Sequence, residues 1–198
     1  MLFRSVGMAS DIFPWNALDG VPYVAVGTNR KVYVFYGGAW ADITPIRDTL
    51  ACTFDTTSGS ATVTVNCTAH EAIPGDFVTL DNVTGDPGGI PNASLENEFE
   101  VQAVLTDNAF TILSPVQASS TATAAGTADA EFQIHVGSDK SFVDFGWGTG
   151  TWGLSSWGTP RPASSALTLT ALIWQFDNYG QNLIMQQVDG GIYEWNPS

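Results

Sequence analysis

Two segments near opposite ends of the chain share one pattern, and this internal repeat constrains the fold more than any other feature. Residues 22–40 and 174–195 each read as a short apolar strand, a polar turn, a second strand, a turn containing Gly, and an aromatic-rich third strand. Antiparallel strands joined by tight turns in this rhythm are typical of β-propeller blades. A propeller needs about four to eight blades to close, so we expect an open piece that copies of the chain or other chains complete.

The stretch between the two repeats has a different composition and predicts an inserted domain. From about residue 52 to 126 the chain is rich in Thr, Val, Ala and Asp and contains no Lys or Arg. Short apolar strands separated by polar turns are expected there, at 62–65, 76–80, 98–104 and 109–113. Such a series without a helical period predicts a small β-barrel or sandwich.

Together these patterns predict an all-β protein of β-propeller-like blade segments with an inserted small β-barrel or sandwich domain. The expected organisation is an irregular N-terminal arm at 1–20, a propeller-like shell at 21–50 and 128–198, and the inserted barrel at 51–127. A hydrophobic content of 44%, with 12% aromatic residues, argues for a folded chain.

The chain is strongly acidic, with a formal net charge of −14 from 20 Asp and Glu against 6 Lys and Arg. Binding nucleic acid through its phosphates needs clustered cations, so the central region is a poor candidate for DNA binding. The acidity has two interpretations: it serves solubility, or it keeps DNA off a conduit wall or complements a basic neighbour. No stretch approaches the ~20 apolar residues of a membrane-spanning helix, and residues 1–7 lack the apolar core of a signal peptide, so neither export nor membrane spanning is expected.

Seven tryptophans are candidate packing or assembly residues. Three of them, Trp147, Trp152 and Trp157, each precede a Gly at a spacing of five residues. The glycine allows the backbone to bend, and each indole can bury roughly 200 Å². We expect these three to pack inside the protein or against a neighbouring subunit, and the same role is assigned to Trp15, Trp40, Trp174 and Trp195.

Cys52 and Cys67 are the two cysteines of the chain, too few for a disulfide scaffold. They could lie on paired strands. The favoured prediction is nevertheless a pair of reduced thiols that pack as small hydrophobic side chains.

No set of residues forms a catalytic constellation. His70 and His135 have no Cys or carboxylate partner at metal-ligand spacing, so both are interpreted as structural. Glu96, Glu98 and Glu100 alternate along one strand face and could bind Ca²⁺ or a basic partner, but solvation is the preferred interpretation because a calcium loop is lacking. The fingerprints of a nucleophile elbow, a P-loop and a dinucleotide site are also missing. We therefore expect no enzyme, no cofactor and no metal site.

The shell segments resemble a known family. Residues 25–35, 40–47, 147–153, 174–180 and 190–195 are similar, in this order, to tail proteins of short-tailed phages, the hub, nozzle or stabilisation proteins that form a ring below the portal. The resemblance implies a virion structural protein of the tail, assembled in the host cytoplasm. It also implies a homo-oligomer, with six copies around a DNA channel, contacts with other tail or portal proteins, and passive contact with translocating DNA.

The insert carries a second resemblance. Residues 63–65, His70, 75–78, 97–101 and 110–112 look like the small β-barrel known as the first catalytic cysteine half-domain of ubiquitin-activating enzymes. That half-domain contributes no nucleophile, so the resemblance implies a spacer or contact module without activity.

One alternative function remains open at the level of sequence. A carbohydrate-binding or cell-surface-recognition β-protein also uses exposed aromatic side chains and carboxylates. The burial of the tryptophans distinguishes the two, since a sugar-binding indole stays open in a groove.

Overall fold

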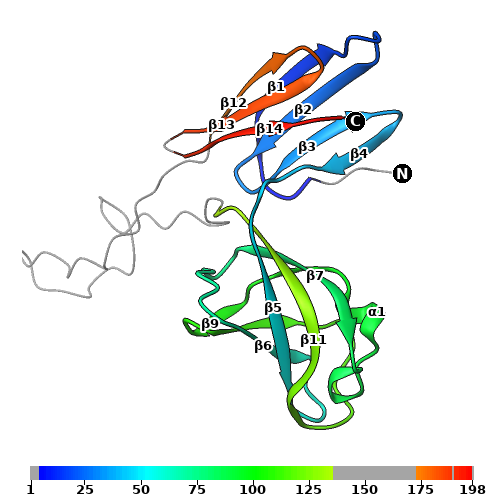
Figure 1. Ribbon diagram of the computed structural model, residues 1–198, viewed down its shortest axis with the longest axis vertical. Coiled ribbons are helices and arrows are strands. Elements are labelled where there is room, and N and C mark those ends of the chain that lie inside the picture. The colour runs from blue at the N-terminus through cyan, green and yellow to red at the C-terminus, as the bar shows by residue number, and fades with distance from the viewer. Residues whose placement is uncertain (1–4, 136–172, 189, 198) are drawn as a thin grey trace, which may run out of the picture.

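The computed structural model describes residues 5–135, 173–188 and 190–197, which form three antiparallel sheets (Figure 1). The first sheet is a four-stranded meander of β1 (Ala9–Asn16), β2 (Pro22–Thr28), β3 (Val32–Tyr36) and β4 (Ala39–Asp42). A second, three-stranded meander contains β12 (Trp174–Tyr179), β13 (Asn182–Gln187) and β14 (Ile192–Trp195). The all-β prediction is confirmed, whereas the propeller blades stay a prediction, because no described sheet closes.

These two sheets pack on each other and make up what we call the shell lobe, at the top of Figure 1. Their shared core joins Trp15, Tyr23 and Val34 of the first sheet to Leu183 of the second. Two indoles also bond across: Trp15 Nε1 donates to the Gln181 carbonyl at 3.1 Å, and Trp174 Nε1 to the Thr28 carbonyl at 3.0 Å. The two ends of the chain therefore fold as one unit.

The N-terminal segment differs from the irregular arm expected at 1–20. Residues Ala9–Asn16 form β1, which pairs with β2 along its length. Pro14 is tolerated because β1 is an edge strand. One side of such a strand has no neighbour, so the missing N–H of proline need not remove a hydrogen bond between strands. Phe13 and Trp15, two residues apart, both face the core. Apolar residues with a period of two are the sequence pattern that indicates a strand.

The middle of the chain forms a second body, which we call the insert lobe. Its seven-stranded sheet has the order β8-β7-β11-β5-β6-β10-β9. The strands are β5 (Ile46–Thr56), β6 (Thr62–Cys67), β7 (Phe77–Thr84), β8 (Glu98–Glu100), β9 (Ala103–Thr106), β10 (Ala109–Leu113) and β11 (Ala122–Gln133). Two short helical pieces, a 3-10 turn at Pro87–Gly89 and α1 at Asn92–Leu95, lie between β7 and β8.

The sheet of the insert lobe curls around a single core. Consecutive strands β8 and β9 stand at its opposite edges with only Val101 and Gln102 between them, so the two edges come together without closing. Fully buried side chains, among them Phe54, Phe110 and Phe132, fill the interior. In the described structure no strand of this lobe pairs with β3.

Strands β5 and β11 connect the two lobes and pair with each other, from Ile46 opposite Gln133 to Thr56 opposite Ala122. The boundaries expected from composition, 51 and 127, fall inside these two strands. The insert lobe thus begins and ends on one two-stranded ribbon (Figure 1).

The prediction of reduced cysteines is wrong. Cys52 on β5 lies directly opposite Cys67 on β6, and the two form a disulfide with a Cα–Cα distance of 4.6 Å. That separation lies within the range that a disulfide spans. Composition could not reveal the bond, because it depends on the register of two strands.

Candidate functional site

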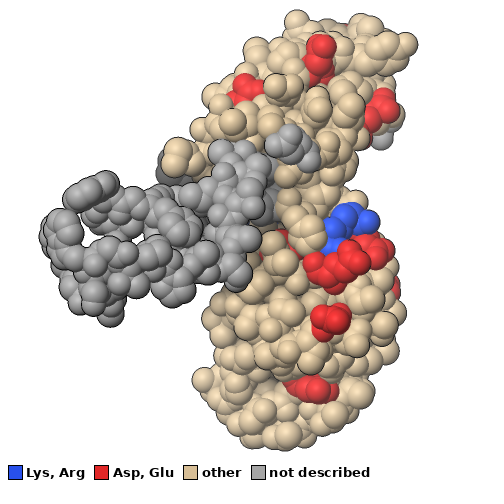
Figure 2. Space-filling model, turned by 90° about the vertical axis from the view of Figure 1, so that its left-hand side faces the viewer, with Lys and Arg blue, Asp and Glu red and all other residues tan. Residues whose placement is uncertain are grey.

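Charged side chains gather where the shell lobe meets the insert lobe. Arg30 and Lys31 come from the turn between β2 and β3, Asp42 from the end of β4, and Glu98 and Glu100 from β8. We call these five residues the junction cluster. The basic side chains of the cluster are covered, at 3% exposure for Arg30 and 2% for Lys31. The face drawn in Figure 2 is mostly uncharged, with one small basic patch beside carboxylates near the level at which the lobes meet.

Lys31 is the centre of the junction cluster. Its side chain is only 2% exposed, and Nζ donates to Asp42 Oδ2 at 2.5 Å and to Glu98 Oε2. The ammonium also lies 4.4 Å from the centroid of the Phe77 ring. A buried charge is tolerated when it is paired and hydrogen-bonded, and Lys31 meets both conditions with partners from both lobes.

Arg30 makes a second bridge between the lobes. Its Nη2 donates to the Gly75 carbonyl at 2.5 Å and lies 3.3 Å from Glu100 Oε1. Because the Glu100 side chain is 46% exposed, water screens this ion pair, and the hydrogen bond to the Gly75 carbonyl contributes more to the bridge.

A local hydrogen-bond pattern aims both cations at the insert lobe. The buried Thr28 hydroxyl accepts the N–H of Arg30 at 3.0 Å and that of Lys31 at 2.8 Å. These hydrogen bonds fix the backbone conformation at Arg30 and Lys31, and with it the direction in which both side chains extend.

The interpretation of all three glutamates as merely solvated is incomplete for Glu98 and Glu100: both pair with basic residues of the shell lobe, although the Glu100 side chain stays 46% exposed. Only Glu96 is without such a partner among the ion pairs of the described residues. The partners of Glu98 and Glu100 lie 67 and 70 residues away, a distance that strand alternation does not reveal.

Burial raises the pKa of the Tyr33 phenol above its ordinary value. The Val6 N–H, which donates to the phenol oxygen at 3.0 Å, lowers this pKa, while the nearby charges of Asp42 and Glu98 raise it further. The negative charges of Asp42 and Glu98, two carboxylates of the junction cluster, therefore contribute to the pKa of Tyr33 in the shell lobe.

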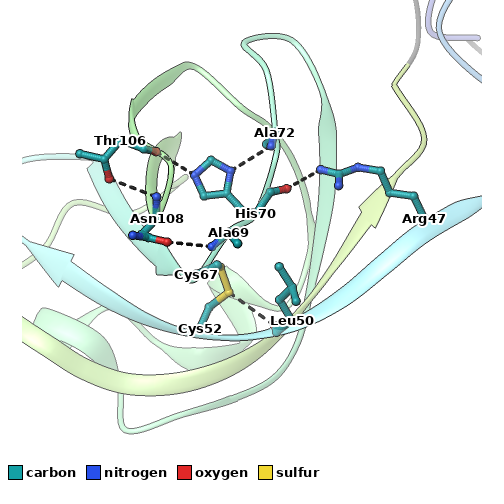
Figure 3. The surroundings of a disulfide bond; sticks show 9 residues. All are labelled: Arg47, Leu50, Cys52, Cys67, Ala69, His70, Ala72, Thr106 and Asn108. Atoms are coloured by element: carbon teal, nitrogen blue, oxygen red, sulfur yellow. Dashed lines mark hydrogen bonds between the residues drawn. A yellow bond between two sulfur atoms is a disulfide. The ribbon is translucent and has the colours of Figure 1, made fainter.

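The two histidines occupy different settings. His70 is buried, and its ring accepts the Ala72 N–H at Nδ1 (3.0 Å), so Nε2 carries the proton and donates to the Thr106 carbonyl at 3.1 Å (Figure 3). Phe110 and Phe132 pack against this ring. His70 is therefore a packed side chain whose ring nitrogens are both engaged.

His135 has a carboxylate partner that sequence spacing did not reveal. Its Nδ1 lies 2.9 Å from Oδ2 of Asp76, a buried residue that also accepts the Ile73 N–H. The pair closes the end of β11 against the turn that precedes β7. In the described ranges no group of three or more His, Cys, Asp or Glu is arranged to hold a metal ion.

The tryptophans that the structure describes pack against other groups. Trp15 and Trp174 are buried, Trp40 lies 5.2 Å from the Phe35 ring, and Trp195 meets the rings of Trp15 and Tyr23 edge-on. Trp147, Trp152 and Trp157 lie outside the described residues, so their packing role stays a prediction.

These features define an all-β protein of two lobes, joined by a β-ribbon and by ion pairs around two buried cations. Among its described residues, no helix is long and apolar enough to cross a membrane. No protein-family model and no curated protein matches the chain. A phage phi92 endosialidase of known structure superposes with a TM-score of 0.34 at 18% identity, over 62% of this chain and 18% of that one. The chain thus spans less than a fifth of the endosialidase, and a TM-score this low assigns neither fold nor function.

Proposed function

We propose that this chain is a structural protein of a phage tail, that it forms a ring-shaped hub or nozzle with copies of itself, and that it has no enzymatic turnover. The observation that carries the proposal is the shell lobe, in which two antiparallel meanders from opposite ends of the chain pack on each other as successive blades do. The resemblance of the shell sequence to tail proteins of short-tailed phages supports the same role.

The edges of the shell sheets support assembly. Strands β4 and β14 each end a sheet, and within the described residues no strand pairs with their outer sides. Open edges present unpaired N–H and C=O groups to another chain. In the proposed ring, these edges and the faces beside them meet the next copy.

Exposed apolar side chains also mark the shell lobe as a contact surface. Leu18 is 82% exposed and Tyr179 is 79% exposed. They lie in neighbouring turns, since the Leu18 Cδ1 atom comes within 3.9 Å of a Cβ built at Gly180. We call Leu18 and Tyr179 the apolar tip. Grouped apolar exposure of this kind usually marks an interaction site.

The intramolecular bonding of the described Lys and Arg residues supports passive contact with DNA rather than DNA binding. Arg30, Lys31 and Arg47 are the Lys and Arg residues in the described ranges, and each bonds to a carboxylate or carbonyl of its own chain. A surface whose cations are all engaged, as they are in the described ranges, does not retain a polyanion. In this proposal the insert lobe is an acidic spacer that projects from the shell or lines the conduit, near other tail or portal proteins.

The alternative of carbohydrate recognition needs an open aromatic platform. Trp15 and Trp174 are buried, and Trp40 and Trp195 pack against neighbouring rings in tilted and edge-on arrangements. The described tryptophans therefore favour packing over sugar binding.

Sedimentation velocity and electron microscopy test the proposal, with the chain alone and mixed with neighbouring tail proteins. Rings or incorporation into particles are expected, with six copies as the leading arrangement. Leu18→Lys should reduce assembly at least tenfold, because it places a charge at the apolar tip. Leu105→Lys, at a leucine of β9 that is 56% exposed, should assemble as the natural chain does. A dispersed monomer that joins no ring or particle would overturn the proposal.

A further inference from the structure

We propose that the outer face of the first shell sheet, the side of β1–β4 turned away from the second shell sheet, pairs with the same face of a second copy of the chain about a two-fold axis. This contact goes beyond the proposed ring. It uses a sheet face and leaves the open edges of β4 and β14 free, so two copies can pair whether or not a ring forms.

Strand register gives the first shell sheet two apolar faces. Trp15, Tyr23 and Val34 point to the core that it shares with the second sheet. Residues that alternate with them point the other way. On that side, one row crosses all four strands: Pro14, Val24, Phe35 and Trp40. The row beside it contains Ile12, Val26, Tyr33 and Asp42. A sheet that is apolar on both faces is typical of a layer covered on both sides.

The second shell sheet instead has the pattern of an outermost layer. Its inner face carries apolar side chains such as Phe176 and Met185. On its outer face, the register aligns Asp177, Ile184 and Glu194 in one row, and Gln175, Gln186 and Ile192 in the next. In the ion pairs of the described residues, neither Asp177 nor Glu194 has a cationic partner. Alternation of this kind is typical of a sheet with one face in water.

Part of the outer face of the first sheet is covered and part is open. Val26 and Tyr33 are buried, and the Val6 N–H donates to the Tyr33 phenol oxygen. The open part, which we call the outer patch, has four residues that range from half-buried to exposed: Ile12, Pro14, Val24 and Phe35. Adjacent apolar side chains left open in this way usually mark a contact site.

The charge distribution indicates which partner fits the outer patch. The four residues of the patch are uncharged, and Asp42 in the neighbouring row is bonded to Lys31. Two copies that each carry a net charge of −14 repel each other, so they approach most readily through a face without unpaired carboxylates.

A head-to-tail contact is less favourable than a two-fold contact. If the outer patch met the second shell sheet of the next copy, Asp177 and Glu194 would be buried against apolar side chains, and burying an unpaired charge is costly. Two outer patches avoid this cost. A surface that matches itself about a two-fold axis is also the commonest arrangement in protein oligomers.

The test uses the full chain with Leu18→Lys, so that pairing is measured where ring assembly is weakened. Sedimentation equilibrium should show a reversible dimer of the 21.0 kDa chain. Adding Ile12→Lys should weaken pairing at least tenfold, because it places a charge in the outer patch at a side chain that is 62% exposed. A Leu18→Lys chain that stays monomeric at every soluble concentration would overturn the pairing. A dimer that joins no ring or particle would support it and contradict the ring.

Ile192→Lys is the matched control. Ile192 is 70% exposed, and like Ile12 it lies on an edge strand and on the outer face of a shell sheet. Pairing should be unchanged in this variant, and its loss would indicate head-to-tail stacking and overturn the two-fold contact. If circular dichroism shows that Ile12→Lys does not fold, Ile12→Thr, which suits a strand, replaces it in the comparison.

A mixing experiment gives a second readout. A fluorescently labelled Leu18→Lys chain should form no mixed pairs with the chain that also carries Ile12→Lys, because a two-fold contact needs an intact outer patch on both partners. Mixed pairs would show that one intact patch is enough, and they would overturn the proposal.

Discussion

At the scale of single residues, the phenol of Tyr33 links the stability of the shell lobe to pH. Its pKa is raised in the folded chain, so the unfolded chain loses this proton first as pH rises above about 10. Between the unfolded and folded pKa values the folded state binds more protons, and stability falls with rising pH. Below that window the phenol contributes no pH dependence.

Tyr33→Phe tests this linkage. At pH 7 the variant should be less stable by about 1 kcal/mol, because the Val6 N–H loses its acceptor. Above pH 10 the difference in unfolding free energy should shrink, since only the natural chain carries the titrating phenol. Urea unfolding at pH 7, 9 and 11 measures it, and a difference that stays constant across these values would contradict the assignment.

Residue roles were the part of this molecule that the sequence predicted least well. The partners of Lys31, Glu98 and His135 are set by contacts between distant strands, which no local sequence pattern indicates. The disulfide shows the same limit, since Cys52 and Cys67 are 15 residues apart and only the register of β5 and β6 makes them opposite.

At the scale of elements, one glycine determines how closely the two shell sheets approach. A Cβ placed on Gly27 of β2 would lie 2.8 Å from the Cβ and Cδ1 atoms of Trp174 on β12. Trp174 is buried and bonded to Thr28, so it cannot move away without loss. Gly27 therefore provides space for the indole.

Gly27→Ala should cost about 1 to 3 kcal/mol through overpacking. It should also increase amide hydrogen exchange in β12 and β13. Gly20→Ala is the matched control, since its added Cβ meets nothing within 4 Å; its left-handed backbone still costs about 1 kcal/mol, but exchange in β12 and β13 should not change. Equal exchange in the two variants would show that Gly27 does not set this contact.

Elements themselves were predictable where alternation and turn residues agree. The strands expected at 62–65, 76–80 and 109–113 correspond to β6, β7 and β10. The strand expected at 98–104 is instead two strands, β8 and β9, at opposite edges of the curled sheet. Its apolar pattern runs through the break, so only the curvature of the sheet, a property of the whole lobe, decides where the strand divides.

At the scale of the whole molecule, Lys31 holds the two lobes in one orientation. Lys31→Met keeps most of the apolar stem but leaves Asp42 and Glu98 without their common cation. Because both carboxylates are about one third exposed and water can solvate them, the loss should cost about 1 to 2 kcal/mol rather than the full penalty of a buried unpaired charge. Small-angle X-ray scattering of a non-assembled preparation should show a wider range of interlobe distances, with the secondary structure unchanged in circular dichroism.

Glu96→Gln is the control for Lys31→Met, since Glu96 is an exposed carboxylate of the same acidic stretch. It should change stability by no more than about 0.5 kcal/mol and leave the scattering curve unaltered. If Lys31→Met behaved like Glu96→Gln, the ribbon of β5 and β11 alone would be setting the orientation.

The pairing of β5 with β11 makes the insert lobe easy to gain or lose during evolution. Because Ile46 lies opposite Gln133, the chain enters and exits the insert lobe through two adjacent antiparallel strands, like the two arms of a hairpin. To the host sheet it is equivalent to a long loop with its ends already together, and lengthening a loop adds little to the free energy of closing it. A lobe attached in this way can be lost, gained or exchanged as a cassette, while the tryptophan-lined host retains its own core.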